Sequence, residues 1–378
     1  MNKNYLLTPG PTPLPPYVLK SLSQPIIHHR TPQFQQILKD VFEGLKYLFQ
    51  TSNDVFILAS SGTGAMEAAV ANIINKGDKV LVIEGGKFGE RWTELNKVYG
   101  AEINLVKVEW GTAIAPSKVR EILSQDSNIK AVYCTHCETS TAVATNIKSL
   151  GQVVRNTNAI LVVDAISSLG TLELRTDDWG LDIVVSGSQK GLMLPPGLGL
   201  LSVSPKAWCY VQSCNAPRYY FDLRLAKKAL ADTDTPFTPA IDIIIALNQV
   251  LKEIEKEGLD KILARNKKLA YATREAMKAM GLEIYAKDFS DSVTAVKVPE
   301  GIDGEKLVKT MRDVDGVTMA GGQSQLKGKV FRIAQMGYIT ESDLKIGINT
   351  LEENLAKMGY KFEKGIGVKT FEQKLREK

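Results

Sequence analysis

The chain has 378 residues, too many for one ordinary hydrophobic core, and this length predicts two domains. Apolar residues make up 44% of the chain and charged residues 24%, a composition typical of a soluble globular protein. The formal charge of +5 comes from lysines and arginines scattered along the chain, so we expect neither a nucleic-acid nor a membrane surface.

Signals for export or for a membrane are not found in the sequence. No stretch approaches the ~18 consecutive apolar residues of a membrane span, and the first residues lack the apolar core of a secretory signal. Four cysteines do not make a disulfide framework. Cys134 and Cys137 form a CxxC pair, but a second pair at zinc spacing is missing, so buried thiols are favoured over a metal or redox site. We therefore expect a cytoplasmic protein without a metal.

Strands and helices alternate through the first part of the chain. A proline-rich opening is expected to be extended, and helical spacing of apolar residues predicts a helix over 34–50. Short apolar runs predict strands at 55–59, 79–84, 103–108, 131–135, 159–164 and 183–186, with helices at 65–74, 88–99, 116–123 and 147–157. Most of these strands are continuously apolar, which predicts an α/β fold with a mainly parallel sheet covered by helices.

The pattern changes after Asn215. One long helical stretch is expected over 241–277, then strands at 292–298 and 330–334 and helices at 304–314 and 341–358. The charged end, 364–378, favours a solvated helix or frayed end over a partner site. We expect a smaller α+β domain here, and we divide the chain into an extended segment (1–20), a large ligand-binding domain (21–255) and a small C-terminal domain (256–378).

Three polar features follow predicted strands, where ligands of open parallel sheets bind. The turn Ser61-Gly62-Thr63 precedes a helix whose free N–H groups can bind phosphate, although a dinucleotide turn or a plain tight loop fits as well. Asp164 ends a buried strand and needs a partner for its charge, unless it is a helix cap or part of an ion pair. Lys190 follows the next strand, and a desolvated lysine is the residue that forms a Schiff base. Together, in this chain order, they match what pyridoxal 5′-phosphate (PLP) requires.

The motifs around these residues resemble the class V aminotransferases of fold type I, in the branch of the alanine–glyoxylate and serine–pyruvate aminotransferases. The resemblance covers nearly the whole chain, and the stretch from Ser186 to Lys190 is the most specific part of it. Further supporting stretches are 7–13, 28–32, 61–68, 163–170 and 329–333. The resemblance implies a PLP-binding large domain and a homodimer with active sites at the subunit interface.

The resemblance also implies a role for each of several residues in holding PLP. The implied cofactor ligands are Ser61, Gly62, Thr63 and Gln189 at the phosphate, Phe88 and Ile166 on the two ring faces, Thr139 at the ring hydroxyl, Asp164 at the ring nitrogen and Lys190 at the aldehyde. Read from the residues alone, Phe88 could instead be plain core and Thr139 a cap.

Four other residues are implied at the substrate or at the neighbouring subunit. Arg332 would clamp the substrate carboxylate, unless it is a surface ion pair, and His29 would form a wall of the substrate pocket. Thr238 would reach the phosphate of the neighbouring subunit, unless it is a turn residue. Relatives often carry a tyrosine where this chain has Thr235, so a second contact across the interface stays open.

The implied function is ping-pong transamination from alanine or serine to glyoxylate or pyruvate. Lys190 would move the α-proton, while Asp164 would keep the ring nitrogen protonated. Phosphoserine or aspartate is the alternative donor, and a non-enzymatic interaction subunit that keeps the fold is the alternative role. A cysteine desulfurase is disfavoured because no cysteine follows Cys214. A nicotinamide dehydrogenase with Glu84 as its ribose acid fits the first turn but leaves Lys190 and Asp164 unexplained.

Overall fold

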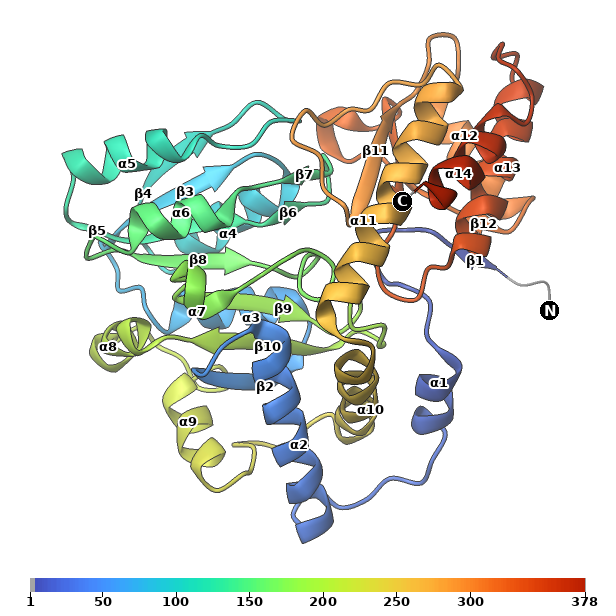
Figure 1. Ribbon diagram of the computed structural model, residues 1–378. Coiled ribbons are helices and arrows are strands. Elements are labelled where there is room, and N and C mark those ends of the chain that lie inside the picture. The colour runs from blue at the N-terminus through green and yellow to red at the C-terminus, as the bar shows by residue number, and fades with distance from the viewer. Residues whose placement is uncertain (1–3, 378) are drawn as a thin grey trace.

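A seven-stranded sheet forms the centre of the computed structural model, which describes residues 4–377 (Figure 1). The strands lie in the order β2-β10-β9-β8-β5-β3-β4. Their bounds are β2 (Asp54–Ser60), β3 (Lys79–Glu84), β4 (Glu102–Lys107), β5 (Ile129–Thr135), β8 (Ile160–Asp164), β9 (Ile183–Gly187) and β10 (Gly197–Val203). Neighbouring strands are parallel except at β10, which is antiparallel to both β2 and β9. The predicted mainly parallel sheet is confirmed, and β10 is an addition that the apolar pattern did not predict.

The helices cover both faces of this sheet. They are α2 (Pro32–Phe49), α3 (Gly62–Ala71), α4 (Lys87–Val98), α5 (Pro116–Gln125), α6 (Ile147–Val154), α7 (Thr176–Trp179), α8 (Pro205–Ser213), α9 (Leu223–Ala231) and α10 (Ile241–Glu257). Successive residues of β8 alternate between two cores: Leu161 packs with α2, α6 and α10, whereas Ile160 and Val162 pack with α3 and α4. This two-sided burial explains why the strands read as continuous apolar runs.

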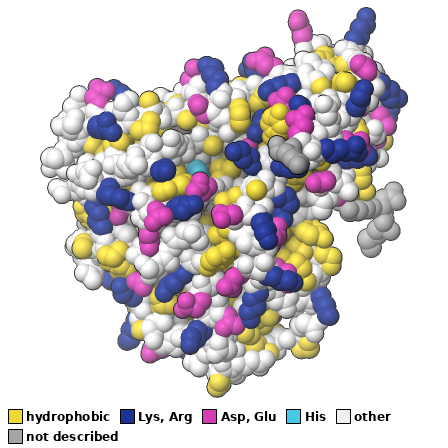
Figure 2. All heavy atoms as spheres, in the orientation of Figure 1, with side chains coloured by type: hydrophobic (Ala, Val, Ile, Leu, Met, Phe, Trp, Pro, Cys, Tyr) yellow, Lys and Arg dark blue, Asp and Glu magenta, His cyan; other side chains and the backbone are white. Residues whose placement is uncertain are grey.

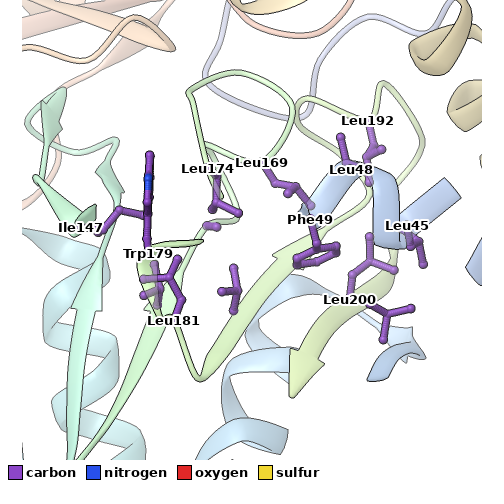
Figure 3. Close-up of a cluster of buried hydrophobic side chains, with 14 of the residues drawn as sticks. Leu45, Leu48, Phe49, Ile147, Leu169, Leu174, Trp179, Leu181, Leu192 and Leu200 are labelled. Carbon is purple, nitrogen blue, oxygen red and sulfur yellow. The ribbon is translucent and has the colours of Figure 1, made fainter. Parts of the chain in front are cut away.

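Figure 3 shows part of the first of these cores. Leu45, Leu48 and Phe49 of α2 lie beside Leu200 of β10. Phe49 is fully buried, and burying one such side chain stabilises the fold by about 1.5–3 kcal/mol. The packed core holds the strand ends that carry the polar residues described below.

β10 also brings the turn before α3 close to the sheet. A Cβ at Gly199 would lie 2.5 Å from the Oγ atom of Ser60 and 2.9 Å from the carbonyl oxygen of Ser61. Only glycine permits this approach. Gly197 and Gly199 also interrupt the apolar run from which a strand would be predicted.

The C-terminal part has its own core and a smaller antiparallel sheet, in the order β11-β14-β13. Its elements are α11 (Leu259–Ala279), β11 (Val293–Lys297), α12 (Gly304–Asp313), β12 (Val317–Thr318), β13 (Ala320–Gly321), η1 (Ser324–Leu326), β14 (Val330–Ala334), α13 (Glu341–Lys357) and α14 (Ile366–Arg376). A short pair, β6 (Cys137–Glu138) and β7 (Val143–Ala144), completes the strands besides β1. The predicted smaller α+β unit is thus present, while the division at residue 255 stays a prediction.

Three expectations about elements need correction. The single helix over 241–277 is wrong, because Gly258 at φ +87° separates α10 from α11. The end is neither frayed nor wholly solvated, because α14 packs Phe371 (1% exposed) into the C-terminal core. The opening is extended only in part: β1 (Tyr5–Leu6) pairs with β12, but α1 (Pro16–Leu22) is a helix with proline in its first turn. Residues 1–3 and 378 lie outside the described residues.

The surface is mixed in charge. Figure 2 shows one face of the molecule, on which Lys and Arg side chains alternate with Asp and Glu and no patch of a single sign dominates. In residues 4–377 no helix is both long enough and apolar enough to cross a membrane.

Candidate functional site

Lys190 lies in a buried turn just after β9. Its side chain is 9% exposed, and Nζ donates a hydrogen bond to the carbonyl oxygen of Pro9. The Thr12 hydroxyl donates to the backbone carbonyl of Lys190 at 2.9 Å, so the N-terminal segment closes over the lysine. Burial lowers the pKa of Lys190 to about 8. At this pKa about a tenth of the amine is unprotonated at pH 7, far more than for an ordinary lysine, and the unprotonated form is the nucleophile.

Asp164 ends β8, the strand next to β9. Its side chain is buried, and Oδ1 accepts a hydrogen bond from the backbone N–H of Ile166 at 2.8 Å. Burial raises the pKa of Asp164 to about 7, although the positive charges of Arg91 and Lys190 oppose this shift. Within the described chain no cation lies within ion-pair distance of Asp164. A cationic ligand group would relieve the cost of burying this carboxylate.

The turn before α3 forms a cradle of backbone N–H groups. Ser61 is the N-cap residue in extended conformation, and its side chain does not cap the helix. A Cβ at Gly62 would lie 2.6 Å from Cδ1 of Ile166, and one at Gly187 would lie 3.3 Å from the nitrogen of Gly62. The Oε1 atom of Gln189 is buried without a partner beside this turn, so its carboxamide is available to turn an N–H group toward an anion. These features fit a phosphate group.

Phe88 is held at the start of α4 by a buried carboxylate. Oε2 of Glu138 accepts the backbone N–H groups of Phe88 and Gly89, each at 3.0 Å, and Oε1 accepts the Ser140 hydroxyl at 2.5 Å. Glu138 is 4% exposed, and burial raises its pKa. The Phe88 side chain is partly exposed and Arg91 lies over its ring at 5.1 Å, so the interpretation of Phe88 as plain core is wrong.

Arg332 lies in β14 and reaches across to the residue that follows β6. Nη1 donates to the backbone carbonyl of Thr139 at 2.8 Å, and Nε and Nη2 donate to the carbonyl of Gly321 at 3.0 and 2.7 Å. Arg332 is 5% exposed, and burial lowers its pKa to about 10. The alternative of a surface ion pair is wrong, because the guanidinium is buried and meets carbonyl oxygens. Nη1 also donates to Oε1 of Gln323 at 3.4 Å, a longer contact, so the second N–H group of Nη2 is the one that remains for a carboxylate.

Thr238 and His29 are not brought to Lys190 of the same chain. Thr238 is exposed, and in the described chain no hydrogen bond joins either residue to the lysine. Arg30 forms an ion pair with Asp234 at 2.8 Å, so the segments 28–30 and 234–238 share one surface. Thr235 is buried, and its hydroxyl donates to the carbonyl of Phe237 at 2.8 Å.

The cysteine pair is buried, as the sequence predicts. Cys134 and Cys137 are free thiols, and Sγ of Cys137 lies 3.2 Å from Oγ of Ser290. Burial raises the pKa of Cys137 to about 12 and that of Cys134 still further, so neither thiol is reactive at neutral pH. Across residues 4–377 no three His, Cys, Asp or Glu side chains are grouped as metal ligands.

The strand order argues against the dinucleotide interpretation of the first turn. Such a turn follows a central strand of a doubly wound sheet, whereas β2 is the edge strand here. Glu84, the proposed ribose acid, accepts the hydroxyl of Thr93 at 2.5 Å. The dehydrogenase alternative is therefore wrong.

The family is decided by comparison with known proteins. Residues 4–346 match the family model of the class V aminotransferases. The chain belongs to this family. Among curated relatives, this class V aminotransferase is 42% identical over 373 residues to the "Soluble hydrogenase, small subunit" of Synechococcus sp., with 97% of each chain covered. It is 36% identical over 384 residues to the L-aspartate–glyoxylate aminotransferase of Paracoccus denitrificans, covering 100% of this chain and 97% of the relative.

A solved structure agrees over the whole chain. The ureidoglycine–glyoxylate aminotransferase of Bacillus subtilis superposes with a TM-score of 0.95 at 29% identity, covering 100% of this chain and 99% of that one. The resemblance, the fold type and the transaminase activity predicted from the sequence are confirmed by these comparisons.

Two charged residues of this class V aminotransferase site were not predicted. Glu138 holds the N-terminus of α4, and Arg91 donates to the Thr63 hydroxyl at 3.1 Å. The sequence contains a weak signal for Glu138, which stands in an otherwise uncharged run from Cys134 to Val143. Arg91 has no such signal, because a charged residue in an amphipathic helix normally marks the solvated face.

Replacing Glu138 with alanine is expected to lower the free energy of unfolding by about 2–4 kcal/mol, since two buried N–H groups lose their acceptor. Denaturant unfolding followed by circular dichroism measures this loss. The substitution Glu90→Ala removes an acid from the first turn of α4 that, among residues 4–377, pairs with partly exposed Lys87 alone, so it should cost about 1 kcal/mol or less. Equal stability of the two variants would contradict the structural role of Glu138.

Proposed function

We infer that this aminotransferase binds PLP between α3, β8 and β9 and transfers an amino group from a small amino acid to glyoxylate or pyruvate. The observation that supports this most is the pairing of two buried groups at neighbouring strand ends. Lys190 has an amine of lowered pKa, and Asp164 is a buried acid with no cation at ion-pair distance in the described part of the chain. PLP has both the aldehyde that a lysine binds and the ring nitrogen that an acid can keep protonated.

The remaining residues around the site fit the rest of the cofactor. The N–H groups of the turn 61–63 and the unpartnered carboxamide of Gln189 suit the phosphate. Phe88 and Ile166 supply apolar surfaces suited to the two faces of a planar ring. When bound, PLP supplies an electron sink that stabilises negative charge on the substrate's α-carbon.

The protein's own groups would perform the remaining work. Arg332 binds the α-carboxylate through the open N–H group of Nη2 and, in place of the long contact with Gln323, through Nη1. Once the donor's amino group has replaced it at the aldehyde carbon, the freed Nζ of Lys190 would take the α-proton and deliver it to the C4′ carbon, a role that its pKa near 8 suits. Asp164 holds a proton on the ring nitrogen. The same steps, run in reverse with a second 2-oxo acid, would complete a ping-pong cycle.

Glyoxylate is the acceptor that the relatives support, because both similar aminotransferases carry it in their names. Their donors differ, and Arg332 recognises only the carboxylate that all donors share. We keep alanine and serine as donors, with aspartate as the first alternative because of the Paracoccus denitrificans relative and phosphoserine as the second.

We also propose a homodimer in which the surface formed by 28–30 and 234–238 completes the site of the second subunit. Thr238 is exposed, and within residues 4–377 its hydroxyl has no hydrogen-bond partner, so it is available to a phosphate of the neighbouring subunit. Arg30 and Asp234 hold the two segments of this surface together. The hydroxyl of Thr235 already has an acceptor in its own chain, so we assign it no contact across the interface.

The test is a spectrum followed by a substrate screen. The purified protein should be yellow and should lose its colour when an amino donor is added. Alanine, serine, aspartate and phosphoserine are then screened against glyoxylate, pyruvate and 2-oxoglutarate. A yellow protein that no donor bleaches would instead favour an interaction subunit, a role that the hydrogenase-subunit name of one relative raises. A colourless protein that does not take up PLP would refute the proposed cofactor.

A further inference from the structure

Arg91 is a partly buried cation that lacks an anionic partner. It lies in α4 three residues after Phe88, so both side chains are on the same helix face. In the part of the chain that the structure describes, no carboxylate is within ion-pair distance of its guanidinium. Its contacts are one hydrogen bond to Oγ1 of Thr63 and the ring of Phe88, so most of its five N–H groups remain available.

The contact with Arg91 limits the direction in which the Thr63 hydroxyl can donate its own hydrogen bond. An arginine can only donate, so the Thr63 hydroxyl accepts from Nη1 at 3.1 Å. The hydroxyl's own proton must then point elsewhere. Thr63 is the second residue of α3, whose N-terminal N–H groups form the phosphate cradle. Arg91 therefore orients one hydroxyl beside the cradle and adds a positive charge to the same place.

The charge of Arg91 acts on both strand-end residues of the site, Asp164 and Lys190. Its charge lowers the pKa of Asp164 and also that of Lys190, although burial is the largest cause for both groups. It is thus close enough to influence both groups without contacting either. A cation in this position would be costly to bury without an anion to offset it.

We propose that Arg91 is the positive charge of the phosphate site, acting both on the cofactor phosphate and, as a positioning residue, through the hydroxyl of Thr63. This inference rests on the proposed use of PLP. Arg91 would add a positive charge to the site, because Ser61, Gly62 and Gln189 offer the phosphate only neutral groups. A phosphate dianion next to a guanidinium forms charge-assisted hydrogen bonds that neutral donors do not match.

The experiment compares PLP with pyridoxal, which lacks the phosphate. Both are titrated into the full-length protein after its cofactor is removed, and binding is followed by absorbance. Arg91→Gln is expected to weaken PLP binding by about 10- to 100-fold and to leave pyridoxal binding within about 2-fold. Arg91→Lys should lose less PLP affinity, because it keeps the charge but not the planar fork.

Lys97→Gln is the matched control, because it removes one positive charge from an exposed position of the same helix. It should bind PLP as the unmodified protein does. Inorganic phosphate gives a second readout: it should raise the melting temperature of the cofactor-free protein and of Lys97→Gln, but not that of Arg91→Gln.

The outcomes separate this inference from the proposed function. If the unmodified protein binds PLP and Arg91→Gln binds it equally well, the assignment of Arg91 is overturned. Equal weakening of PLP and pyridoxal would show a role in the fold instead of at the phosphate, and would also overturn it. If the unmodified protein binds neither compound, the proposed cofactor itself fails.

Discussion

Replacing Lys190 with alanine is expected to abolish transamination. The variant loses both the amine that would hold the cofactor and the group that would move the α-proton. General acid–base catalysis alone contributes about 10²- to 10⁴-fold, and the loss of covalent attachment adds to this, so we expect a rate at least about 10⁴-fold lower. The amino donor that the screen selects serves as substrate, and product formation is followed over hours.

Covalent attachment gives a test of Lys190 that does not depend on turnover. Borohydride should fix the cofactor to position 190 of the unmodified protein, and peptide mass mapping should find the added mass there. Lys190→Arg keeps the positive charge but removes the nucleophile, so it should show no added mass. Full activity of Lys190→Ala, or a label on another lysine, would refute the assignment.

The sequence predicted the sheet well because its central strands, such as β8 and β9, are buried on both faces. Residues such as Ile160 and Leu161 face opposite cores, so the strand reads as one apolar run. The same reasoning failed for β10, where Gly197 and Gly199 interrupt the run. A Cβ at Gly199 would collide with the turn before α3, so this close contact requires glycine there. Glycine is not typical of strands, and the sequence signal for a strand is lost. The break at Gly258 was missed because apolar spacing continues on both sides of it.

Strand-end chemistry made Asp164 and Lys190 predictable, because each follows an apolar run in which a charge is unexpected. Glu138 and Arg91 depend on contacts between segments distant in the sequence. Glu138 meets the start of α4, about 50 residues earlier, and Arg91 meets Thr63 of α3. Local periodicity carries no information about such contacts, so these residues became visible only in the folded chain.

Replacing Asp164 with asparagine is expected to have opposite effects on activity and on the stability of the cofactor-free protein. Asparagine cannot keep the ring nitrogen protonated, and the electron sink weakens. We expect the transamination rate to fall by about 10²-fold or more, comparable to the removal of one preorganised charged group from an active site. The comparison with Asp164→Glu, which keeps the acid but shifts it, shows whether charge alone suffices.

Stability should change in the other direction, and the effect should depend on pH. The pKa of Asp164 is raised from its usual 3.8 to about 7 in the folded chain, so protonation favours folding. The wild-type protein therefore loses stability as the pH rises from about 4 to 7, by on the order of 4 kcal/mol in total. Asparagine is neutral throughout and avoids this loss.

The cofactor-free Asp164→Asn protein should consequently melt at a higher temperature than the wild type at pH 8, and the gap should narrow toward pH 5. Thermal unfolding of both proteins at the two pH values measures this. Addition of PLP should reduce or reverse the gap, because a ring cation then compensates the buried carboxylate of the wild type but gains nothing from an amide. A gap that is the same at pH 5 and pH 8 would show that Asp164 does not titrate as a buried, unpaired acid. The observation that most directly supports the proposed cofactor would then be lost, since the need for a cation at the end of β8 follows from that titration.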